Sequence, residues 1–198
     1  MKFLTFGDLH DDKPALKDLL ARAEKPDIDF VVSVGDISVF GRGLRNILKS
    51  FNSLGKKFYV IPGNHESDSM LNELTPEFPN CINFHQKILK MGTYLFLGYG
   101  EGGFTLEDPR FRKIAREWYG KYKGKNIVLV THQPPFGTKL DFLETRHVGN
   151  KDFRKFIERI KPKLAISGHL HETVGIRDKI GPTRLVNPGW DGLVIELK

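Results

Sequence analysis

The sequence predicts a mixed α/β fold, and three of its features carry that prediction. The first half alternates short apolar runs with amphipathic stretches, which is typical of parallel strands joined by helices. The apolar runs are rich in Val, Ile and Phe, so we expect strands that are buried on both faces. The C-terminal region instead alternates short runs with turn residues, which indicates a second, more antiparallel sheet packed on the first.

The first half of the chain has the order strand, helix, strand, helix, strand, with strands expected at residues 3–6, 30–34 and 58–61. We expect the first helix to open around Pro14, because proline suits the first helical turn, and to end at Lys25. The second helix follows Gly43 and closes at Gly55. Parallel strands joined in this way need right-handed crossovers.

The second half of the chain shows shorter elements separated by glycine and proline. Helices are expected at residues 108–123 and, from the apolar spacing at i, i+3, i+4 and i+7, around residues 153–160. A glycine-rich loop is expected at residues 100–104. Strands are expected at residues 83–85, 87–89, 94–100, 127–130, 164–167, 174–177, 183–186 and 193–197.

Length and composition fit one globular domain spanning residues 1–198, with 39% hydrophobic and 28% charged residues. The single cysteine, Cys81, excludes an internal disulfide framework and fits a reducing, cytoplasmic setting. No secretory signal is visible, and no apolar run approaches the ~20 residues of a membrane-spanning helix, so we expect no membrane association. The net charge of +7 suits anionic partners in general.

Metal-ligand residue types follow five of the apolar runs. The five motifs are Asp8-Leu9-His10, Gly35-Asp36, Gly63-Asn64-His65-Glu66, Thr131-His132 and Gly168-His169-Leu170-His171, and they hold five of the seven histidines. If these strands share a sheet, their C-terminal ends lie along one edge, which is where open α/β sheets bind ligands. We therefore expect the five motifs to meet in one cleft.

The residue types in these motifs indicate a metal site. Carboxylates, an amide and imidazoles without a thiolate suit divalent Mn, Fe, Co, Ni or Zn. There are seven candidate ligands, more than one octahedral ion needs, whereas two ions that share Asp36 would use all of them. The candidates are Asp8, His10, Asp36, Asn64, His132, His169 and His171.

The ordered set of motifs, from residue 8 to residue 171, resembles the calcineurin-like metallophosphoesterase superfamily. The resemblance implies a four-layer α-β-β-α sandwich, with two mixed sheets flanked by helices, and two divalent metal ions. Manganese is the ion we expect in vitro, with Fe, Zn, Co or Ni as alternatives. Carried over to this chain, one metal would be held by Asp8, His10, Asp36 and His171, and the other by Asp36, Asn64, His132 and His169.

The activity implied by the resemblance is metal-dependent hydrolysis of a phosphoric ester. Two cations about 3.5–4 Å apart can generate a bridging hydroxide that attacks phosphorus and can neutralise the developing charge. His65 follows a predicted ligand directly, and the resemblance gives it the role of general acid on the leaving oxygen or of a phosphate contact. An imidazole is suited to that work near neutral pH.

Four segments, at residues 132–138, 147–150, 168–172 and 187–189, resemble a small phosphodiesterase branch that includes proteins acting on cyclic nucleotides. Trp190 stands where serine is common in that branch. Arg42 lies too late for the arginine motif of the Ser/Thr protein phosphatases, which disfavours that activity. We favour a phosphodiesterase that acts on a phosphorylated small molecule or a nucleotide. A nuclease, a small-molecule phosphomonoesterase and a catalytically silent scaffold are the alternatives.

Several residues near the motifs stay undecided at this point. His147 is either a contact for the substrate phosphate or a surface histidine, and His85 is predicted to be structural. Glu66 and Glu172 either support a ligand histidine or lie at the surface. The segment 187–189 is either a plain turn or a loop that shapes the cleft.

Residues 110–126 form the one local charge anomaly, with seven Lys or Arg against one Glu and four interleaved aromatic residues. Such a segment could grip a nucleic-acid backbone or stack a base. We favour a solvated basic helix whose aromatic rings pack inward. A nucleic-acid partner is thus possible but not favoured, and the sequence leaves the oligomeric state open.

Overall fold

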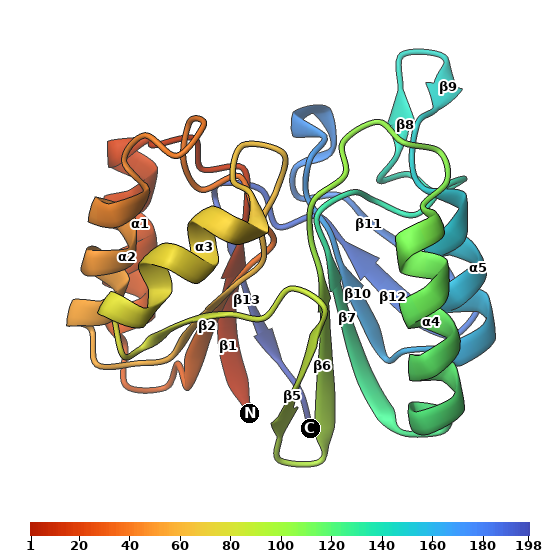
Figure 1. The fold of residues 1–198 in the computed structure, drawn as a ribbon, viewed down its shortest axis with the longest axis horizontal. Helices are drawn as coiled ribbons and strands as arrows, with labels where there is room; N and C mark the ends of the chain where they lie inside the picture. The colour runs from red at the N-terminus through yellow and green to blue at the C-terminus, as the bar shows by residue number, and fades with distance from the viewer.

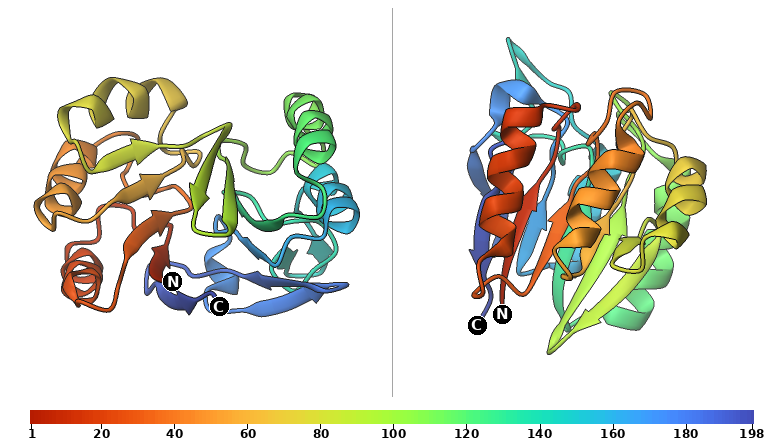
Figure 2. Two further views of the ribbon diagram at one scale, coloured as in Figure 1. Left: turned by 90° about the horizontal axis from the view of Figure 1, so that it is seen from below. Right: turned by 90° about the vertical axis from the view of Figure 1, so that its left-hand side faces the viewer.

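Two mixed sheets lie at the centre of the molecule with helices on their outer faces, in a computed structural model that describes residues 1–198 (Figures 1 and 2). The predicted mixed α/β fold and four-layer arrangement are confirmed. The first sheet has the strand order β13-β1-β2-β3-β4. Its strands are β1 (Lys2–Phe6), β2 (Phe30–Ser33), β3 (Phe58–Val60), β4 (Cys81–Asn83) and β13 (Leu193–Glu196).

The second sheet has the strand order β11-β12-β10-β7-β6-β5. Its strands are β5 (Lys87–Met91), β6 (Tyr94–Tyr99), β7 (Asn126–Thr131), β10 (Leu164–Ile166), β11 (Arg177–Ile180) and β12 (Thr183–Val186). The first sheet is parallel except for the antiparallel edge strand β13, whereas the second sheet has a parallel centre with an antiparallel pair at each margin. A small hairpin of β8 (Phe142–Leu143) and β9 (Arg146–His147) stands above the sheet edge (Figure 1).

Five α-helices cover the outer faces of the sheets: α1 (Lys13–Glu24), α2 (Leu44–Ser53), α3 (Asp68–Leu74), α4 (Pro109–Tyr122) and α5 (Lys151–Ile160). Two short 3-10 helices, η1 (Thr75–Glu77) and η2 (His171–Thr173), complete the set. The helix starts follow from local sequence, because Asp12, Asp108 and Asn150 accept backbone N–H groups as N-caps of α1, α4 and α5. None of the helices combines the length and apolar character that crossing a bilayer requires.

Three apolar clusters hold the layers together. One packs α1 and α2 on the first sheet, and a second packs α4 and α5 on the other sheet. The third lies between the sheets, where residues such as Phe3 and Val32 meet Phe96 and Val130. This packing explains why the central strands are apolar on both faces.

The structure differs from the sequence-based expectation in several elements. The five strands that precede the ligand motifs do not share one sheet, since β1, β2 and β3 lie in the first sheet and β7 and β10 in the second. The strand expected at 174–177 begins only at Arg177, and the final strand joins the first sheet antiparallel to β1. Cys81 begins β4, and burial raises its pKa to about 12.

Candidate metal centre

The predicted ligands lie in the loops that directly follow strands, and several have an unusual backbone. Asp8, His10, Asp36 and His169 have positive φ values of 53°, 46°, 53° and 73°. Residues other than glycine seldom adopt this left-handed region, and such conformations are concentrated at functional sites, where the surroundings impose them.

Hydrogen bonds tie these loops to one another across the two sheets. Within the first sheet, the Asp8 amide donates to the Gly35 carbonyl (3.0 Å) and the His10 amide donates to the Asp36 carbonyl (3.1 Å). The His169 amide, from the second sheet, donates to both carboxylate oxygens of Asp8 at 3.0 Å. The edges of the two sheets therefore form one connected site.

Two glycines make room for the acidic side chains. A Cβ atom on Gly63 would lie 2.0 Å from Asp36 Oδ1, and a Cβ atom on Gly168 would lie 2.5 Å from Asp8 Oδ2. Any larger residue at either position would displace a carboxylate. The glycines of the Gly-Asn-His and Gly-His motifs are thus explained by this close approach.

The structure brings all seven predicted ligands together around one cleft. His10 Nε2 lies 3.1 Å from His171 Nε2, and His132 Nε2 lies 3.4 Å from Asp36 Oδ2 and 3.1 Å from Asn64 Oδ1. Three groups of side chains have potential ligand atoms within 4.8 Å of one another: Asp8, His10 and His171; His10, Asp36 and His65; and Asp36, His132 and His169.

The donor set fits divalent metal ions. The three groups consist of imidazoles and carboxylates and contain no sulfur. Asp36 and His10 each belong to two of the three groups. The Nε2 atom of His169 is buried without a hydrogen-bond partner in the protein, which is costly unless a ligand engages it. His132 Nδ1 lies 2.8 Å from the Val34 carbonyl, so Nδ1 carries a proton that it donates to this oxygen. The other ring nitrogen, Nε2, faces Asp36 and is the atom that could bind a metal.

Electrostatics divides the cleft into an ion pair and a neutral imidazole. Burial alone raises the pKa of Asp36, but the hydrogen bond and charge of His132 outweigh it and hold this pKa at about 2. Burial lowers the pKa of His132, yet Asp36 and Asp8 together raise it to about 9. Burial and the nearby His132 lower the pKa of His169 to about 4, so this ring is neutral at pH 7.

His65 stands at the open side of the cleft. Its amide donates to Asp36 Oδ1 at 2.8 Å, and its ring lies 4.5 Å from the His10 ring. The Phe40 ring, which is 70% exposed, stacks on His65 at 4.2 Å. Because a His65 nitrogen lies within ligand range of His10 and Asp36, the ring can either donate a proton or bind a metal.

Glu66 supports the site in a way that the sequence did not reveal. Its side chain is buried, so a surface position is wrong, and its Oε1 accepts hydrogen bonds from the Ser38 amide and hydroxyl, each at 2.6 Å. It therefore fixes the loop that carries Asp36, rather than a histidine. Glu172 is exposed and lines the cleft.

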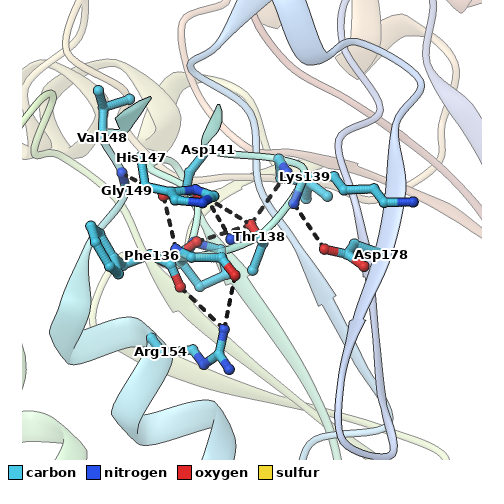
Figure 3. A network of polar contacts seen from close by, with 12 residues as sticks. Phe136, Thr138, Lys139, Asp141, His147, Val148, Gly149, Arg154 and Asp178 are labelled. Carbon is cyan, nitrogen blue, oxygen red and sulfur yellow. Dashed lines mark hydrogen bonds and ion pairs between the residues drawn. The ribbon is translucent and has the colours of Figure 1, made fainter. Parts of the chain in front are cut away.

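His147 lies beside the cleft and not among the residues that line it. Its Nδ1 is 2.9 Å from Asp141, a fully buried carboxylate that also accepts hydrogen bonds from the amides of Gly137, Thr138 and Gly149 (Figure 3). His147 lines a neighbouring cavity of about 430 Å³, and Glu172 lies in the wall of both spaces. The cluster around Asp141 thus orients His147 toward a space next to the cleft.

Aromatic side chains at the cleft are the main feature that the motifs did not predict. Phe104, in the glycine-rich loop, is 62% exposed and lies 4.6 Å from the His169 ring. The Trp190 ring lies 5.5 Å from the His171 ring, next to a turn that Asn187 ties to the Leu170 carbonyl at 3.0 Å. The segment 187–189 is therefore both a turn and a support for the cleft.

Known proteins resemble this chain both in sequence and in fold. The sequence matches the model of the calcineurin-like phosphoesterase family over residues 1–173. It is 32% identical to the uncharacterized protein MJ1162 of Methanocaldococcus jannaschii, covering 95% of this chain and 88% of the relative. It is 26% identical to a Rhodopseudomonas palustris protein named probable cyclic nucleotide phosphodiesterase RPA0124, covering 88% and 73%. Among solved structures, TT1561 of Thermus thermophilus has the same fold, with a TM-score of 0.76 at 14% identity, covering 96% of this chain and 90% of that chain.

Proposed function

The chain belongs to the calcineurin-like phosphoesterase family, and we propose that it is a metal-dependent phosphodiesterase of one domain that spans residues 1–198. The single observation that carries the proposal is the convergence of Asp36 with His132, His10 and His169 on one cleft. The family is metal-dependent and hydrolyses phosphoesters. We further propose a cytoplasmic location, in keeping with the single buried cysteine.

We propose two metal positions in the cleft. One would be held by Asp8, His10, Asp36 and His171, and the other by Asp36, Asn64, His132 and His169. Bound divalent ions, for which manganese is our choice in vitro, supply an activated water and positive charge against the phosphoryl oxygens.

The side chains of the chain itself provide the remaining chemistry. Asp36 and His132 place opposite charges at the centre of the cleft, and a metal would replace the His132 proton as the partner of Asp36. His65 is placed to give a proton to the leaving oxygen, with its ring steered by the stacked Phe40.

The preference for a diester rests on the walls of the cleft. Phe104, Leu143 and Leu170 line it together with the ligands, and Phe40 extends the apolar surface at His65. Such apolar side chains beside the polar ligands can contact the organic substituents of a diester. The relative named a probable cyclic nucleotide phosphodiesterase is consistent with this choice. Because no predicted ligand is missing, a silent scaffold is disfavoured.

The first experiment measures hydrolysis of bis-p-nitrophenyl phosphate and of p-nitrophenyl phosphate with added Mn²⁺, for the wild type and Asp36→Asn. We expect the wild type to prefer the diester and the variant to lose turnover of both esters. The exposed Asp18→Asn in α1 is the matched control and should retain activity. A preference for the monoester would favour a phosphomonoesterase, and no turnover despite bound Mn²⁺ would favour the scaffold.

The proton-donor role of His65 has a separate test. An ester with a poor leaving group needs a general acid, whereas p-nitrophenolate leaves without one. We therefore expect His65→Gln to slow hydrolysis of an alkyl methyl phosphate far more than that of bis-p-nitrophenyl phosphate. Equal losses on both esters would indicate a metal ligand or a phosphate contact instead.

We also propose that His147 contacts a substituent of the substrate from the cavity beside the cleft. The support is the hydrogen bond that His147 Nδ1 donates to Asp141, which leaves Nε2 of His147 for the cavity. His147→Ala should raise KM for large diesters and leave KM for bis-p-nitrophenyl phosphate almost unchanged. Equal KM values for all diesters in both proteins would place His147 outside substrate binding.

A further inference from the structure

Most of the net positive charge of the protein lies on one of its two helical layers. Helices α4 and α5 lie side by side on the outer face of the second sheet (Figure 1). Together they carry nine Lys or Arg residues against three Asp or Glu, a net +6. Helices α1, α2 and α3, on the other side, carry five against four, a net +1. The protein as a whole has +7.

Cations of the two helices converge on a groove of about 180 Å³ between α4 and α5. Arg116 of α4 and Lys155 and Arg159 of α5 line it, are exposed, and form no ion pair with an acidic side chain. Two other cations of these helices are paired within their own helix, Lys121 with Glu117 and Arg154 with Glu158.

The one acidic residue of the groove is already engaged. Asp152 is buried, accepts a hydrogen bond from the Asp108 amide at 2.7 Å, and pairs with Arg112 Nε at 3.2 Å. Its charge therefore does not neutralise the three free cations. Because unpaired like charges on adjacent helices repel one another, an anionic partner in the groove would stabilise the layer.

An aromatic ring lies at one wall of the groove. The Arg159 guanidinium lies over the Tyr119 ring, 4.7 Å from its centroid. A guanidinium stacked in this way keeps its edge N–H groups free for a phosphate, which it can bind through two hydrogen bonds. Phe111 and Phe156 form the apolar floor. Cations beside an aromatic ring are the combination that single-stranded nucleic acids bind.

We propose that the groove between α4 and α5 binds the phosphate backbone of a single-stranded nucleic acid, through Arg116, Lys155 and Arg159. This site shares no residue with the metal cleft, so it is separate from the proposed hydrolysis. A membrane surface fits less well, because the large exposed apolar side chains of the protein all lie outside α4 and α5. The groove is also concave, as a chain of phosphates requires.

The test is fluorescence anisotropy with labelled single-stranded oligonucleotides of RNA and DNA, about 12 nucleotides long so that one strand can span the groove. The full chain is used in EDTA, so that hydrolysis is absent. Three phosphate contacts predict a slope of about −2 for the logarithm of the binding constant against the logarithm of salt, or an affinity about 20-fold lower at 200 mM than at 50 mM. The triple variant Arg116→Gln, Lys155→Gln and Arg159→Gln should bring the slope close to zero.

The matched control removes three exposed lysines from the other helical layer: Lys13→Gln, Lys17→Gln and Lys49→Gln. It has the same net charge as the groove variant, so it reveals any nonspecific attraction, which depends on overall charge. We expect it to bind within about twofold of the wild type, because it leaves the three groove cations in place. Both triple variants should hydrolyse bis-p-nitrophenyl phosphate like the wild type, which shows that they fold.

Several outcomes would overturn the groove as the binding site: no binding by the wild type, equal weakening in both triple variants, or binding that only Asp36→Asn removes. Binding to anionic vesicles by the wild type, with none to oligonucleotides, would assign the groove to a membrane instead. Binding that persists in Asp36→Asn but is lost in the groove variant supports the proposal even if the protein hydrolyses no ester.

Discussion

The two halves of the molecule supply chemically different side chains to the same cleft. The first sheet contributes all the oxygen donors, Asp8, Asp36 and Asn64, along with His10 and His65. The second sheet contributes only imidazoles, from His132, His169 and His171. The ion pair of Asp36 with His132 therefore joins the halves, and each of the two proposed metal positions takes ligands from both halves.

The outer layers differ as well. Helices α1 to α3 are nearly neutral, whereas α4 and α5 carry most of the net charge. Both halves contribute residues to the cleft of the proposed metal ligands, but the groove between α4 and α5 belongs to one half alone. Substitutions in the cleft should therefore affect a function that needs both halves, whereas substitutions in the groove between α4 and α5 should affect one half alone.

The largest effect is expected when the shared ion pair is broken from either side. Asp36→Asn and His132→Gln should each lower kcat/KM for bis-p-nitrophenyl phosphate by at least about 10³-fold, because each removes a proposed ligand from a two-metal site. The double variant should be less than about tenfold worse than either single variant, since residues that act as one unit are not additive. Steady-state kinetics with saturating Mn²⁺ measures all three.

Replacement of a buried histidine outside the cleft provides the control. His85→Gln keeps the cleft intact and should retain kcat/KM within about threefold. If the losses of the two single variants instead multiply in the double variant, the two halves act independently and the shared site is wrong.

A second comparison places the same small change in each half. In Gly63→Ala the new Cβ atom meets Asp36 Oδ1, so we expect a loss of about 1–3 kcal/mol in the free energy of unfolding together with most of the activity. In Gly120→Ala, in α4, no atom lies within 4 Å of the new Cβ, and helix propensity should add about 0.5–1 kcal/mol.

Urea denaturation and hydrolysis of bis-p-nitrophenyl phosphate on both variants measure these effects. Full activity in Gly63→Ala would mean that Asp36 can move without consequence, and the close packing would then have no role in the site.

The contrast between the halves also shows how far the sequence could predict the site. The five motifs follow strands as predicted, because buried parallel strands have a clear apolar signature and their ends carry the loops. The condition that all five strands share one sheet does not hold, because they divide between the two sheets. β3 and β7 are apolar on both faces, so nothing local to Phe58–Val60 or Asn126–Thr131 says which sheet each joins.

The elements that the sequence missed have weak local signals. Helix α3 is seven residues long with one buried side chain, Leu71, so its apolar periodicity is short. Strand β11 carries Arg177, Asp178 and Lys179, and its place is fixed by antiparallel pairing with β12 rather than by apolar residues. The role of Glu66 depends on a contact with Ser38, 28 positions away, which no local pattern encodes.

Metal removal tests whether the cleft joins the halves in stability as well as in activity. An ion that binds only the folded state should raise the free energy of unfolding by about 2.7 kcal/mol at 100 times its Kd. Mn²⁺ should therefore raise the melting temperature of the wild type relative to EDTA, and raise that of Asp36→Asn much less. Hydrogen exchange should slow in the loops after β1 and β2 and in those after β7 and β10 alike. Slower exchange in the loops of one sheet alone would restrict the metal to that half.

The smallest effect concerns His85, which follows β4 and lies against the second sheet. It is buried and its Nδ1 accepts a hydrogen bond from the Gly100 amide at 2.9 Å, and burial lowers its pKa below the usual 6.5. As the pH falls below 6.5, His85 therefore takes up a proton in the unfolded chain while it stays neutral in the folded chain. Stability from this residue is complete above pH 6.5 and is lost as the pH falls below it.

Between pH 6.5 and pH 5, the free energy of unfolding of the wild type should fall more steeply than that of His85→Gln, by up to about 1.4 kcal/mol per pH unit for one proton. Urea denaturation in EDTA at several pH values gives both curves, and the other histidines cancel in the difference. Glutamine can still accept the Gly100 amide but does not titrate, so parallel curves would show that His85 takes up its proton equally well in the folded chain. In that case the packing of His85 between the halves would be open to water, and the contact between β4 and the second sheet would be looser than its burial indicates.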